Sequence, residues 1–273
     1  MIEHTVGASR ARVLLDSIWN GKRILTIEAR FPRVVLAELN THRQLSKNAA
    51  SSRAIPTDKY IAQLDAPYVP VFTKNKKGMV GTEELPKDLQ DRAEEIYRNV
   101  MYACIDGVRK LNALVPEGLH KEDVNRLLEP FLFVVDLITA TEWDNFFRLR
   151  TADDAMRPIR DAARAIKACF ESSVPVERDL HAPLIQDDEQ DLPRADKMRI
   201  SAGRCARISY LTHEGKRDRT KDIELGDRIK ADRHLSPFEH VAYPEAAPDI
   251  PCKNFVGWHQ LRADIEAEIY GTP

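Results

Sequence analysis

The residues best suited to chemistry lie in one polar stretch, residues 38–53, which reads Glu-Leu-Asn-Thr-His-Arg-Gln-Leu-Ser-Lys-Asn-Ala-Ala-Ser-Ser-Arg. An apolar run, residues 34–37, leads into it, and Pro56 follows it. After Leu45 the stretch contains no large apolar residue, so it can bury little hydrophobic surface. Its cations, hydroxyls and small side chains suit the binding of several phosphate oxygens at once. The same composition is typical of a solvated polar turn, so both readings stay open at this point.

The spacing within this stretch resembles a known motif. Arg43, seven intervening residues and Ser51, followed by Arg53, are similar to the Arg-His-Arg-(seven residues)-Ser motif of the flavin-dependent thymidylate synthases. Thr41 stands where that family has its first arginine. The resemblance implies two sets of binding residues here. Ser51, Ser52 and Arg53 would bind the nucleotide, and His42 and Arg43 would bind the flavin.

A second motif lies about one hundred residues further on. The run Asn-Phe-Phe-Arg-Leu-Arg at residues 145–150 resembles the family's Asn-Phe-(Phe or Leu)-x-Leu-Arg. By this match Asn145 faces the flavin and Arg150 reaches the pyrimidine. Buried aromatic residues would fix the guanidinium, which could then stabilise negative charge on a pyrimidine carbonyl. A plain helix-terminal arginine is the alternative.

One further arginine matches the family. In the family, an arginine just before a Leu-Pro element contacts the nucleotide. Arg126 is the matching position in this chain. The alternative is a surface salt bridge between Arg126 and Glu122 or Glu129.

The chain also departs from the family at several positions. Thr139 and Thr141 stand where the family tends to carry an asparagine and an arginine for the flavin, and Glu38 stands where it usually has glutamine. The family's Ala-Gln-x-Glu-Ile-Arg becomes Ala-Met-Arg-Pro-Ile-Arg at residues 155–160. These changes suggest that the cofactor contacts have been rebuilt.

Two motifs near the C-terminus occur in an unusual order. Residues 205–210 (Cys-Ala-Arg-Ile-Ser-Tyr) and 234–240 (His-Leu-Ser-Pro-Phe-Glu-His) resemble elements that precede the Arg-His-Arg loop in the family. We interpret the chain as a circularly permuted, phage-like variant, because domain termini often lie close together. The match implies that the flavin site includes Ser209, Ser236 and Glu239, with His234 near the flavin or folate ring.

Taken alone, the same histidine-containing run, 234–240, could be a metal site. It has no thiol ligand beside it, and the family needs no metal, so no metal is expected there.

The first elements that position these residues are predicted from periodicity. Helical spacing over residues 11–18 predicts a helix that ends at Gly21. The alternating, β-branched run 23–31 predicts a strand before Pro32, and residues 34–39 a helix or strand that delivers the polar loop.

The middle of the chain is predicted to be mainly helical. Prolines and glycines in residues 56–84 indicate a loop, which could act as a mobile lid. Apolar residues then recur every three or four positions and predict a long helix with a buried stripe. The stripe consists of Leu89, Ala93, Ile96, Val100, Cys104, Val108 and Leu111. A short polar helix, 120–130, is expected to end at Pro130.

The predictions continue to the C-terminus. Residues 131–138 are apolar and expected to be buried, and Thr141 with Asp144 resembles a capping box that opens a helix. That helical pattern continues to Phe170, with Pro158 expected in a first turn.

Two polar segments remain. The proline-rich, acidic segment 173–198 is predicted to be a solvated connector. Residues 254–262 are assigned to packing or subunit contact.

Composition narrows the class of protein. With 273 residues the chain can bury one sizeable core, and 31% of its residues are charged. It contains no apolar run near the roughly 18 residues that would span a bilayer, and its N-terminus lacks the order of a secretory signal. We therefore expect a cytoplasmic protein without a membrane partner. A net charge of −2 argues against binding of long nucleic acid, and four widely spaced cysteines are expected to be reduced and packed.

The fold expected from this resemblance is α/β (α+β), with a twisted, mainly antiparallel sheet flanked by long helices. One domain would cover residues 1–273, with a phosphate-loop and helical part (1–172), a connector (173–198) and a permuted flavin-binding part (199–273). The resemblance implies reductive methylation of dUMP to dTMP, with FAD, NADPH and methylenetetrahydrofolate. It also implies a homotetramer whose active sites are shared between subunits.

Alternatives remain open. Glu38 could accept the exocyclic amine of cytosine, so a related enzyme could methylate or hydroxymethylate dCMP or another pyrimidine nucleotide. The substituted ligands Thr41, Thr139 and Thr141 also allow a flavin- or nucleotide-binding protein without catalysis. Arg150 and Ser51 are the candidate catalytic residues. No activating histidine–acid pair is evident around Ser51, which favours a binding role over a nucleophilic one.

Overall fold

A computed structural model describes residues 2–78, 80–212 and 217–271. The chain folds around a mainly antiparallel sheet of strand order β1-β2-β3-β5-β4, with β6 paired in parallel to β2. The strands are β1 (Glu3–Val6), β2 (Ser9–Trp19), β3 (Lys22–Pro32), β4 (Ser46–Ala49), β5 (Phe133–Ala140), β6 (Val176–Glu177), β7 (Ala242–Pro244), β8 (Pro251–Cys252), β9 (Phe255–Val256) and β10 (Trp258–Gln260). The last four pair as β7 with β10 and β8 with β9.

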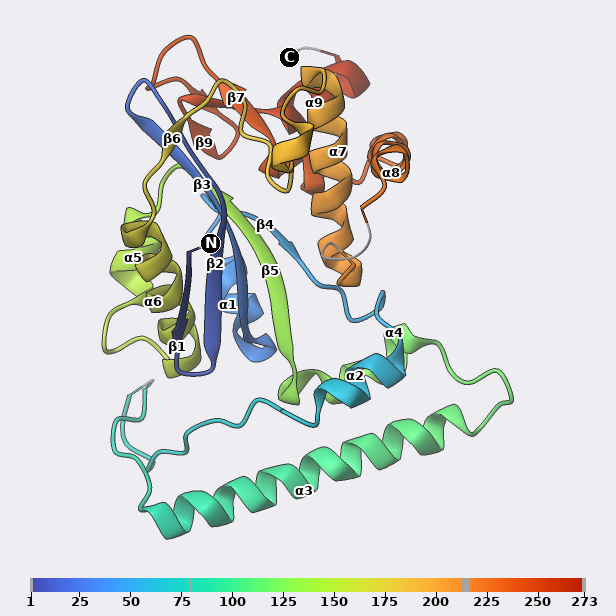
Figure 1. Cartoon of the computed structure of the whole chain (residues 1–273). Coiled ribbons are helices and arrows are strands. Elements are labelled where there is room, and N and C mark those ends of the chain that lie inside the picture. Colours follow the sequence, from blue (N-terminus) through green and yellow to red (C-terminus); the bar gives the residue numbers. More distant parts are fainter. Residues whose placement is uncertain (1, 79, 213–216, 272–273) are drawn as a thin grey trace.

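Helices flank this sheet, which confirms the expected fold class (Figure 1). The α-helices are α1 (Leu36–Asn40), α2 (Thr57–Gln63), α3 (Lys87–Asn112), α4 (Lys121–Val124), α5 (Asp144–Arg150), α6 (Arg157–Ser172), α7 (Arg194–Arg207), α8 (Arg219–Ala231) and α9 (Leu261–Tyr270). The 3₁₀ turns are η1 (Arg33–Val35), η2 (Asn125–Phe131), η3 (Asp187–Glu189), η4 (Ile208–Tyr210) and η5 (Ser236–His240). Figure 1 shows α5 and α6 on one side of the sheet and α7 and α9 on the other.

The hairpin of β2 and β3 corrects one prediction. Residues 11–18 are not helical but form most of β2, which pairs antiparallel with β3. The two strands are joined by Asn20 and Gly21, whose φ angles are 46° and 78°. Asn-Gly is a strong signal for a two-residue hairpin turn, because both positions need φ above zero. The local helical spacing was therefore overridden by turn chemistry and strand pairing.

The centre of the sheet follows the predictions. β3 lies over the predicted strand 23–31, and Ile24, Leu25, Ile27 and Phe31 are fully buried. β5 occupies the apolar run that begins at residue 131 and pairs with both β3 and β4. Nearly continuous burial along β3 results because both faces of the sheet are covered.

Helices α5 and α6 cover one face. In α6 the predicted apolar positions Ile159, Ala163 and Ile166 are buried, and Pro158 lies in the first turn as expected. The predicted capping box before α5 is wrong. Trp143 is the N-cap residue, and the Thr141 hydroxyl instead accepts a hydrogen bond from the backbone N–H of Val256, at 3.0 Å.

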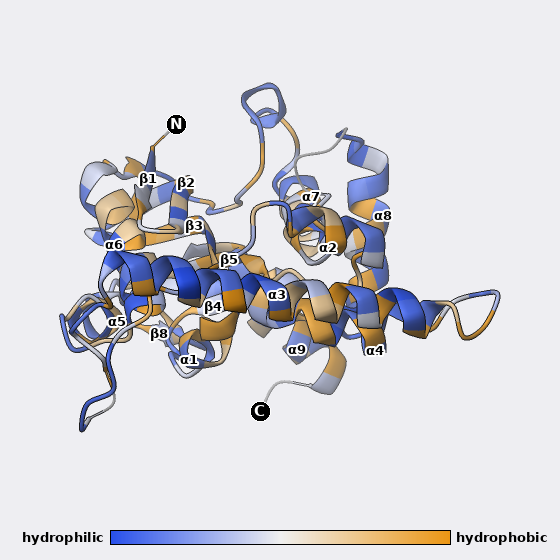
Figure 2. Ribbon diagram, turned by 90° about the horizontal axis from the view of Figure 1, so that it is seen from below, coloured by the Kyte–Doolittle hydropathy of each residue, from blue (hydrophilic) through white to orange (hydrophobic). Residues whose placement is uncertain are grey.

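The long helix α3 is present as predicted, but its stripe is only partly core. Val108 is buried, whereas Leu89, Ile96 and Val100 are 45%, 58% and 52% exposed. Figure 1 shows α3 running beneath the body of the molecule, and Figure 2 shows apolar segments interspersed with polar ones along α3. Periodicity identified the helix, but it could not tell which apolar residues face the chain's own core.

Two segments predicted to be irregular have structure. Within residues 56–84, α2 is helical, and Thr73 and Glu84 form an isolated antiparallel β-bridge. Met79, in the same segment, lies outside the described residues.

The prediction of a solvated connector over 173–198 is wrong for His181 and Glu189, which are 0% and 2% exposed. Glu189 is buried because it meets Arg204 of α7, and Arg204 also binds Asp222 of α8 at 2.8 Å. This ion-pair group fixes the connector and both helices together.

The remaining sequence-based expectations concern the cysteines and the short helix near 120–130. All four cysteines are free, and Cys169, Cys205 and Cys252 are buried. α4 and η2 form the predicted short helical segment, with Pro130 inside η2. Among the described residues, no helix is both long and apolar enough to cross a membrane.

Replacing Arg204 by alanine should destabilise the fold by up to roughly 3–5 kcal/mol, because it removes the buried partner of two buried carboxylates. Each carboxylate then keeps only one, more exposed arginine, Arg219 for Glu189 and Arg207 for Asp222. Arg199→Ala on the same helix breaks only exposed pairs, with Asp227 and Asp196, and should cost less than about 1 kcal/mol. Urea unfolding of both variants measures the difference. Equal losses would contradict the role given to the buried group.

The same group predicts a pH dependence. Its hydrogen bonds with Arg204, more than any other cause, lower the pKa of Glu189 from 4.5 to about 2. The stability that this carboxylate contributes is therefore complete above pH 4.5 and is lost as the pH falls toward 2.

Candidate functional site

The polar stretch after α1 forms a compact turn held by its own backbone. The N–H groups of Thr41, His42 and Leu45 donate to the carbonyls of Glu38, Leu39 and His42, at 3.1, 3.1 and 3.2 Å. Leu39 and Leu45 are buried and anchor the turn, whereas Arg43 is exposed. The turn therefore presents polar side chains from a fixed backbone.

Arg150, His42 and Glu38 come together beside this turn. The Arg150 Nε–H donates to His42 Nε2 at 2.8 Å, and Arg150 Nη1 lies 3.8 Å from Glu38 Oε2. Phe146 and Phe147 bury the helix that carries Arg150, and Phe146 packs edge-on against the His42 ring with centroids 5.0 Å apart. The guanidinium is thus held by packing and hydrogen bonding, as the aromatic run before it led us to expect.

The electrostatics of this cluster favour a neutral imidazole. Burial, and then the charges of Arg150 and Lys47, lower the pKa of His42 from 6.5 to about 4. A neutral ring keeps a lone pair on Nε2, which the hydrogen bond from Arg150 requires. Arg150 can therefore stay charged next to His42 without repulsion from a second cation.

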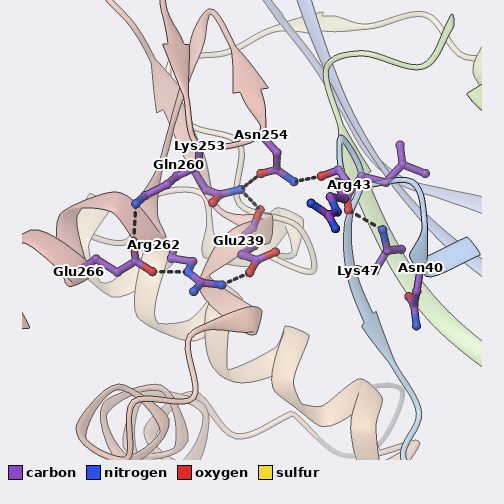
Figure 3. A pocket seen from close by; sticks show the side chains of 10 residues that line it. Asn40, Arg43, Lys47, Glu239, Lys253, Asn254, Gln260, Arg262 and Glu266 are labelled. Atoms are coloured by element: carbon purple, nitrogen blue, oxygen red, sulfur yellow. Dashed lines mark hydrogen bonds and ion pairs between the residues drawn. The ribbon is translucent and has the colours of Figure 1, made fainter. Parts of the chain in front are cut away.

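A cavity of about 480 Å³ opens next to the turn (Figure 3). Figure 3 shows Arg43 and Lys47 on one side of it and Lys253 and Arg262 on the other, with Glu239 between. Glu239 accepts a hydrogen bond from Arg262. The cavity is therefore lined by several cations, although part of their charge is balanced by Glu239.

The C-terminal tail supplies much of this cavity. Gln260 Nε2 donates to the Asn254 Oδ1 at 2.8 Å and to the Ser46 Oγ at 3.1 Å, and Asn254 Nδ2 reaches the Arg43 carbonyl at 3.4 Å. The sequence interpretation assigned residues 254–262 to packing or subunit contact and missed their place at the cavity. The available signal was that polar residues directly flank two aromatic residues: Asn254 precedes Phe255, and His259 and Gln260 follow Trp258. Both aromatic residues are fully buried.

Lys47 joins the cavity to the sheet. Its Nζ donates to the carbonyls of His42 and Leu45, at 2.5 and 2.9 Å. Below it, burial raises the pKa of Asp136 to about 7, while the charge of Lys47 opposes that rise. Burial lowers the pKa of Lys47, and Asp136 and Glu239 oppose that change. Lys47 thus sits in the field of two carboxylates as well as holding the turn.

Two further cavities adjoin the first. One, of about 370 Å³, is lined by His42, Arg43 and Asn145, and it shares Arg43 with the first cavity. The other, of about 460 Å³, includes Arg126 and shares Asn40 with the first. Arg126 also donates to Glu129 at 2.9 Å, so the salt bridge considered as its alternative role is present. The turn after α1 therefore lines two of the cavities, and Asn40 at the end of α1 links the third to the first.

Other predicted site residues lie at the far end of β4. Ser51, Ser52 and Arg53 follow this strand, whereas His42 precedes it. The Ser51 N–H donates to the Ser209 carbonyl at 3.1 Å, so these two residues do meet. Ser52 is buried, its carbonyl accepting from Asn125 at 2.7 Å, and Arg53 is exposed.

The remaining candidates belong to the run 234–240. Ser236 begins η5, the same turn that carries Glu239, and His234 is exposed just before it. His240 is fully buried, with Nδ1 2.8 Å from the Thr139 Oγ1. The binding roles of His234, Ser236 and Ser209 stay predictions.

The substituted positions are used inside the protein. Thr139 is fully buried and also contacts the Thr26 hydroxyl at 2.7 Å, while Thr141 bonds the backbone of β9. Thr41 lines the cavity of His42 and Asn145, and its hydroxyl donates to the Glu38 carbonyl at 2.7 Å.

A comparison with protein families decides the identity. The sequence profile of the family described as "Thymidylate synthase complementing protein" matches residues 23–176, more than half of the chain. The chain belongs to this family, that of the flavin-dependent thymidylate synthases. The resemblance read from the sequence is confirmed over the matched residues. The permuted order of the later motifs lies outside them and stays a prediction.

Membership in this family makes the protein an enzyme that methylates C5 of a pyrimidine nucleotide. Among solved structures, the chain is similar to the UMP/dUMP methylase PolB from Streptomyces cacaoi, bound with 5-Br UMP. The two share 18% identity with a TM-score of 0.45, and the likeness covers 54% of this chain and 69% of that one. A comparison with curated protein sequences found no match to this chain.

The His42–Arg150 contact gives a direct prediction. In the folded protein His42 should titrate near pH 4, and Arg150→Gln should raise its pKa, though not to 6.5, because burial remains. Arg148→Gln on the same helix removes an exposed arginine that bonds Asn145 instead, and should change the His42 pKa less. NMR titration of labelled histidine measures both. A wild-type His42 that titrates near 6.5 would contradict the arrangement.

Proposed function

We propose that this protein converts dUMP to dTMP by FAD-dependent reductive methylation, with methylenetetrahydrofolate as the carbon donor and NADPH as the reductant. The observation that carries the proposal is the fixed Arg150 guanidinium, held by neutral His42, which itself lines the cavity shared by Arg43 and Asn145. Family membership supplies the reaction class. The cluster supplies a charged group of defined position for a pyrimidine carbonyl.

The residues present fit a flavin nucleotide. Arg43 is exposed at the boundary of two cavities, and Lys47, Asn254 and Gln260 line the larger of them. Cations and amide groups of this kind suit the diphosphate and polar ring edges of FAD. When bound and reduced by NADPH, the flavin would supply the hydride that converts the transferred methylene group into a methyl group. The family places Asn145, Ser209, Ser236 and Glu239 at the same cofactor, which this arrangement supports best for Asn145 and Glu239.

The chain's own residues would act by position and charge. Arg150 would stabilise the negative charge that develops on a pyrimidine carbonyl when C5 becomes nucleophilic. His42, neutral, would keep the guanidinium oriented without adding charge. Since Nη2 of Arg150 donates to no residue in the described part of the chain, a donor remains for the substrate.

The second candidate is the same chemistry on dCMP, and Glu38 favours it. Its Oε2 is buried and accepts no hydrogen bond from any described residue, although it lies 3.8 Å from Arg150. A carboxylate at this position would suit the exocyclic amine of cytosine, whereas uracil presents a carbonyl there. Glu38 thus keeps the dCMP alternative, methylated or hydroxymethylated, as the nearest rival.

We also propose a homotetramer with shared active sites. Within one chain, Ser51 and Arg53 lie beyond β4 from Arg150, and a four-residue strand spans about 13 Å. We infer that the arginine at the base and the residues at the phosphate come from different subunits. The exposed Leu89, Ile96 and Val100 of α3 offer an apolar surface for such assembly.

Enzyme assays test the reaction. Purified protein with FAD should oxidise NADPH faster with dUMP than with dCMP, and should form dTMP when methylenetetrahydrofolate is present. Arg150→Gln should lower the rate by roughly 10²–10³-fold, as expected for loss of a charge-stabilising donor. Arg157→Gln removes an arginine that pairs with Glu84 and should leave the rate unchanged.

Other outcomes decide between the alternatives. Faster turnover of dCMP than of dUMP would make dCMP the substrate. Glu38→Gln should then shift the preference toward dUMP. A protein that binds FAD but oxidises no NADPH with either nucleotide would support the reading without catalysis.

Mixing two inactive variants tests the shared site. If one subunit supplies Arg53 and another Arg150, unfolding and refolding an equal mixture of Arg53→Ala and Arg150→Gln should restore part of the activity. Each variant treated alone should remain inactive. No recovery, in a mixture shown by mass to contain mixed oligomers, would mean that each site is built from one chain.

A further inference from the structure

A second group of reactive side chains lies outside the three cavities. Glu245, Cys252 and His259 each offer one ligand atom, and these atoms all lie within 4.8 Å of one another. Glu245 follows β7, Cys252 ends β8 and His259 is the middle residue of β10. The pairing of β7 with β10 and the packing of β10 on β8 bring the three segments together.

The donor set is chemically selective. One imidazole nitrogen, one thiolate and one carboxylate oxygen are a combination that suits Zn²⁺, which binds Cys, His and Asp or Glu in tetrahedral sites. Cys252 is buried, and Glu245 and His259 are half-buried. A cavity of about 510 Å³, whose walls include His259 and Asp264, gives an ion access from outside.

The surroundings of His259 are those of a metal-bound histidine. Its Nε2 lies 2.9 Å from Asp264 Oδ1, and the other oxygen of Asp264 accepts a hydrogen bond from the Tyr243 hydroxyl at 2.8 Å. Histidine ligands in metal sites usually donate their second nitrogen to such a carboxylate, which fixes the ring. The Tyr243 ring also stacks on the His259 ring, with centroids 4.8 Å apart.

The hydrogen bonds of His259 point in the same direction. Its Nδ1 lies only 2.7 Å from Glu245 Oε1, so both ring nitrogens face a carboxylate. A neutral imidazole has one N–H and can donate to only one of them. If Nε2–H donates to Asp264, the lone pair of Nδ1 faces Glu245, and a cation bound by both makes that approach favourable. An imidazolium that donates to both carboxylates is the competing explanation.

We propose that Glu245, Cys252 and His259 bind one Zn²⁺ ion, with water as the fourth ligand. The ion would join strands that are otherwise two or three residues long, which is shorter than strands that are stable alone. The Gln260 N–H donates to the Cys252 Sγ at 3.4 Å, and Lys253 and Asn254 directly follow this cysteine. The site would therefore fix the tail that lines the cavity of about 480 Å³ beside Arg43. It does not depend on which nucleotide is the substrate.

Metal binding to the whole protein tests the proposal. Protein stripped with a chelator and then given Zn²⁺ should bind one ion per chain, and Co²⁺ in its place should give the thiolate-to-cobalt absorption band of a cysteine ligand. Cys252→Ser should abolish this band, and Asp264→Asn should weaken binding by about 10–100-fold. Cys104→Ser, which removes a half-buried cysteine of α3, should change neither.

Stability gives a second, independent measurement. Chelator should lower the melting temperature of wild type and of Cys104→Ser, but should have little effect on Glu245→Gln, which lacks one ligand. Binding of Co²⁺ without the thiolate band, or no bound Zn²⁺ in wild type, would overturn the proposal. Either result would leave His259 as an imidazolium between two carboxylates. These tests use wild type as well as variants, so a Cys252→Ser protein that fails to fold would not prevent a decision.

Discussion

The candidate site depends on one constraint, which is that His42 stays neutral beside a charged arginine. If His42 carried a proton on Nε2, it could not accept the hydrogen bond from Arg150, and two cations would face each other in a half-buried space. Burial, to which the contact with Phe146 contributes, and then the charges of Arg150 and Lys47 lower the pKa of His42 to about 4 and so remove that proton. The aromatic run that buries α5 therefore sets both the position of Arg150 and the charge of its partner.

Lys47 carries this constraint into the sheet. It holds the turn through two carbonyl groups, and it adds to the positive field that keeps His42 unprotonated. Buried Asp136 and the cavity residue Glu239 balance part of that charge. A solvent-exposed lysine in β4 would neither hold the turn nor affect the charge of His42. The register of β4 against β5 therefore matters for the charge of the site as well as for the core.

Sequence reasoning succeeded where a short motif is also a structural unit. The turn that holds His42 and Arg43, and the helix that ends at Arg150, were both found because each candidate binding residue lies beside its own apolar anchors. It failed for residues 11–18, since an apolar cluster of that length fits helical and strand periods, and only the Asn20–Gly21 turn decides between them.

The C-terminal contribution was harder to predict, for a related reason. Asn254, Gln260 and Arg262 lie more than two hundred residues from Arg43, and no local pattern indicates that the two segments meet. Similarly, the apolar residues of α3 have the right period for a core helix, yet Ile96 and Val100 are exposed. Periodicity reports that a helix has an apolar face, but the partner of that face depends on tertiary or subunit contacts.

The buried threonine at position 139 shows how the C-terminal segment is attached to the sheet. Thr139 contacts both Thr26 and His240, and Thr26 in turn contacts His181, so strands β3 and β5, the connector and η5 share one hydrogen-bonded chain. Burial lowers the pKa of both histidines to about 3, so the chain is uncharged and its burial costs less than that of an ion pair. Because His240 is adjacent to Glu239, this chain also fixes the carboxylate that meets Arg262 at the cavity. We therefore interpret the threonine as an anchor for η5, at a position where the family resemblance implies a flavin ligand.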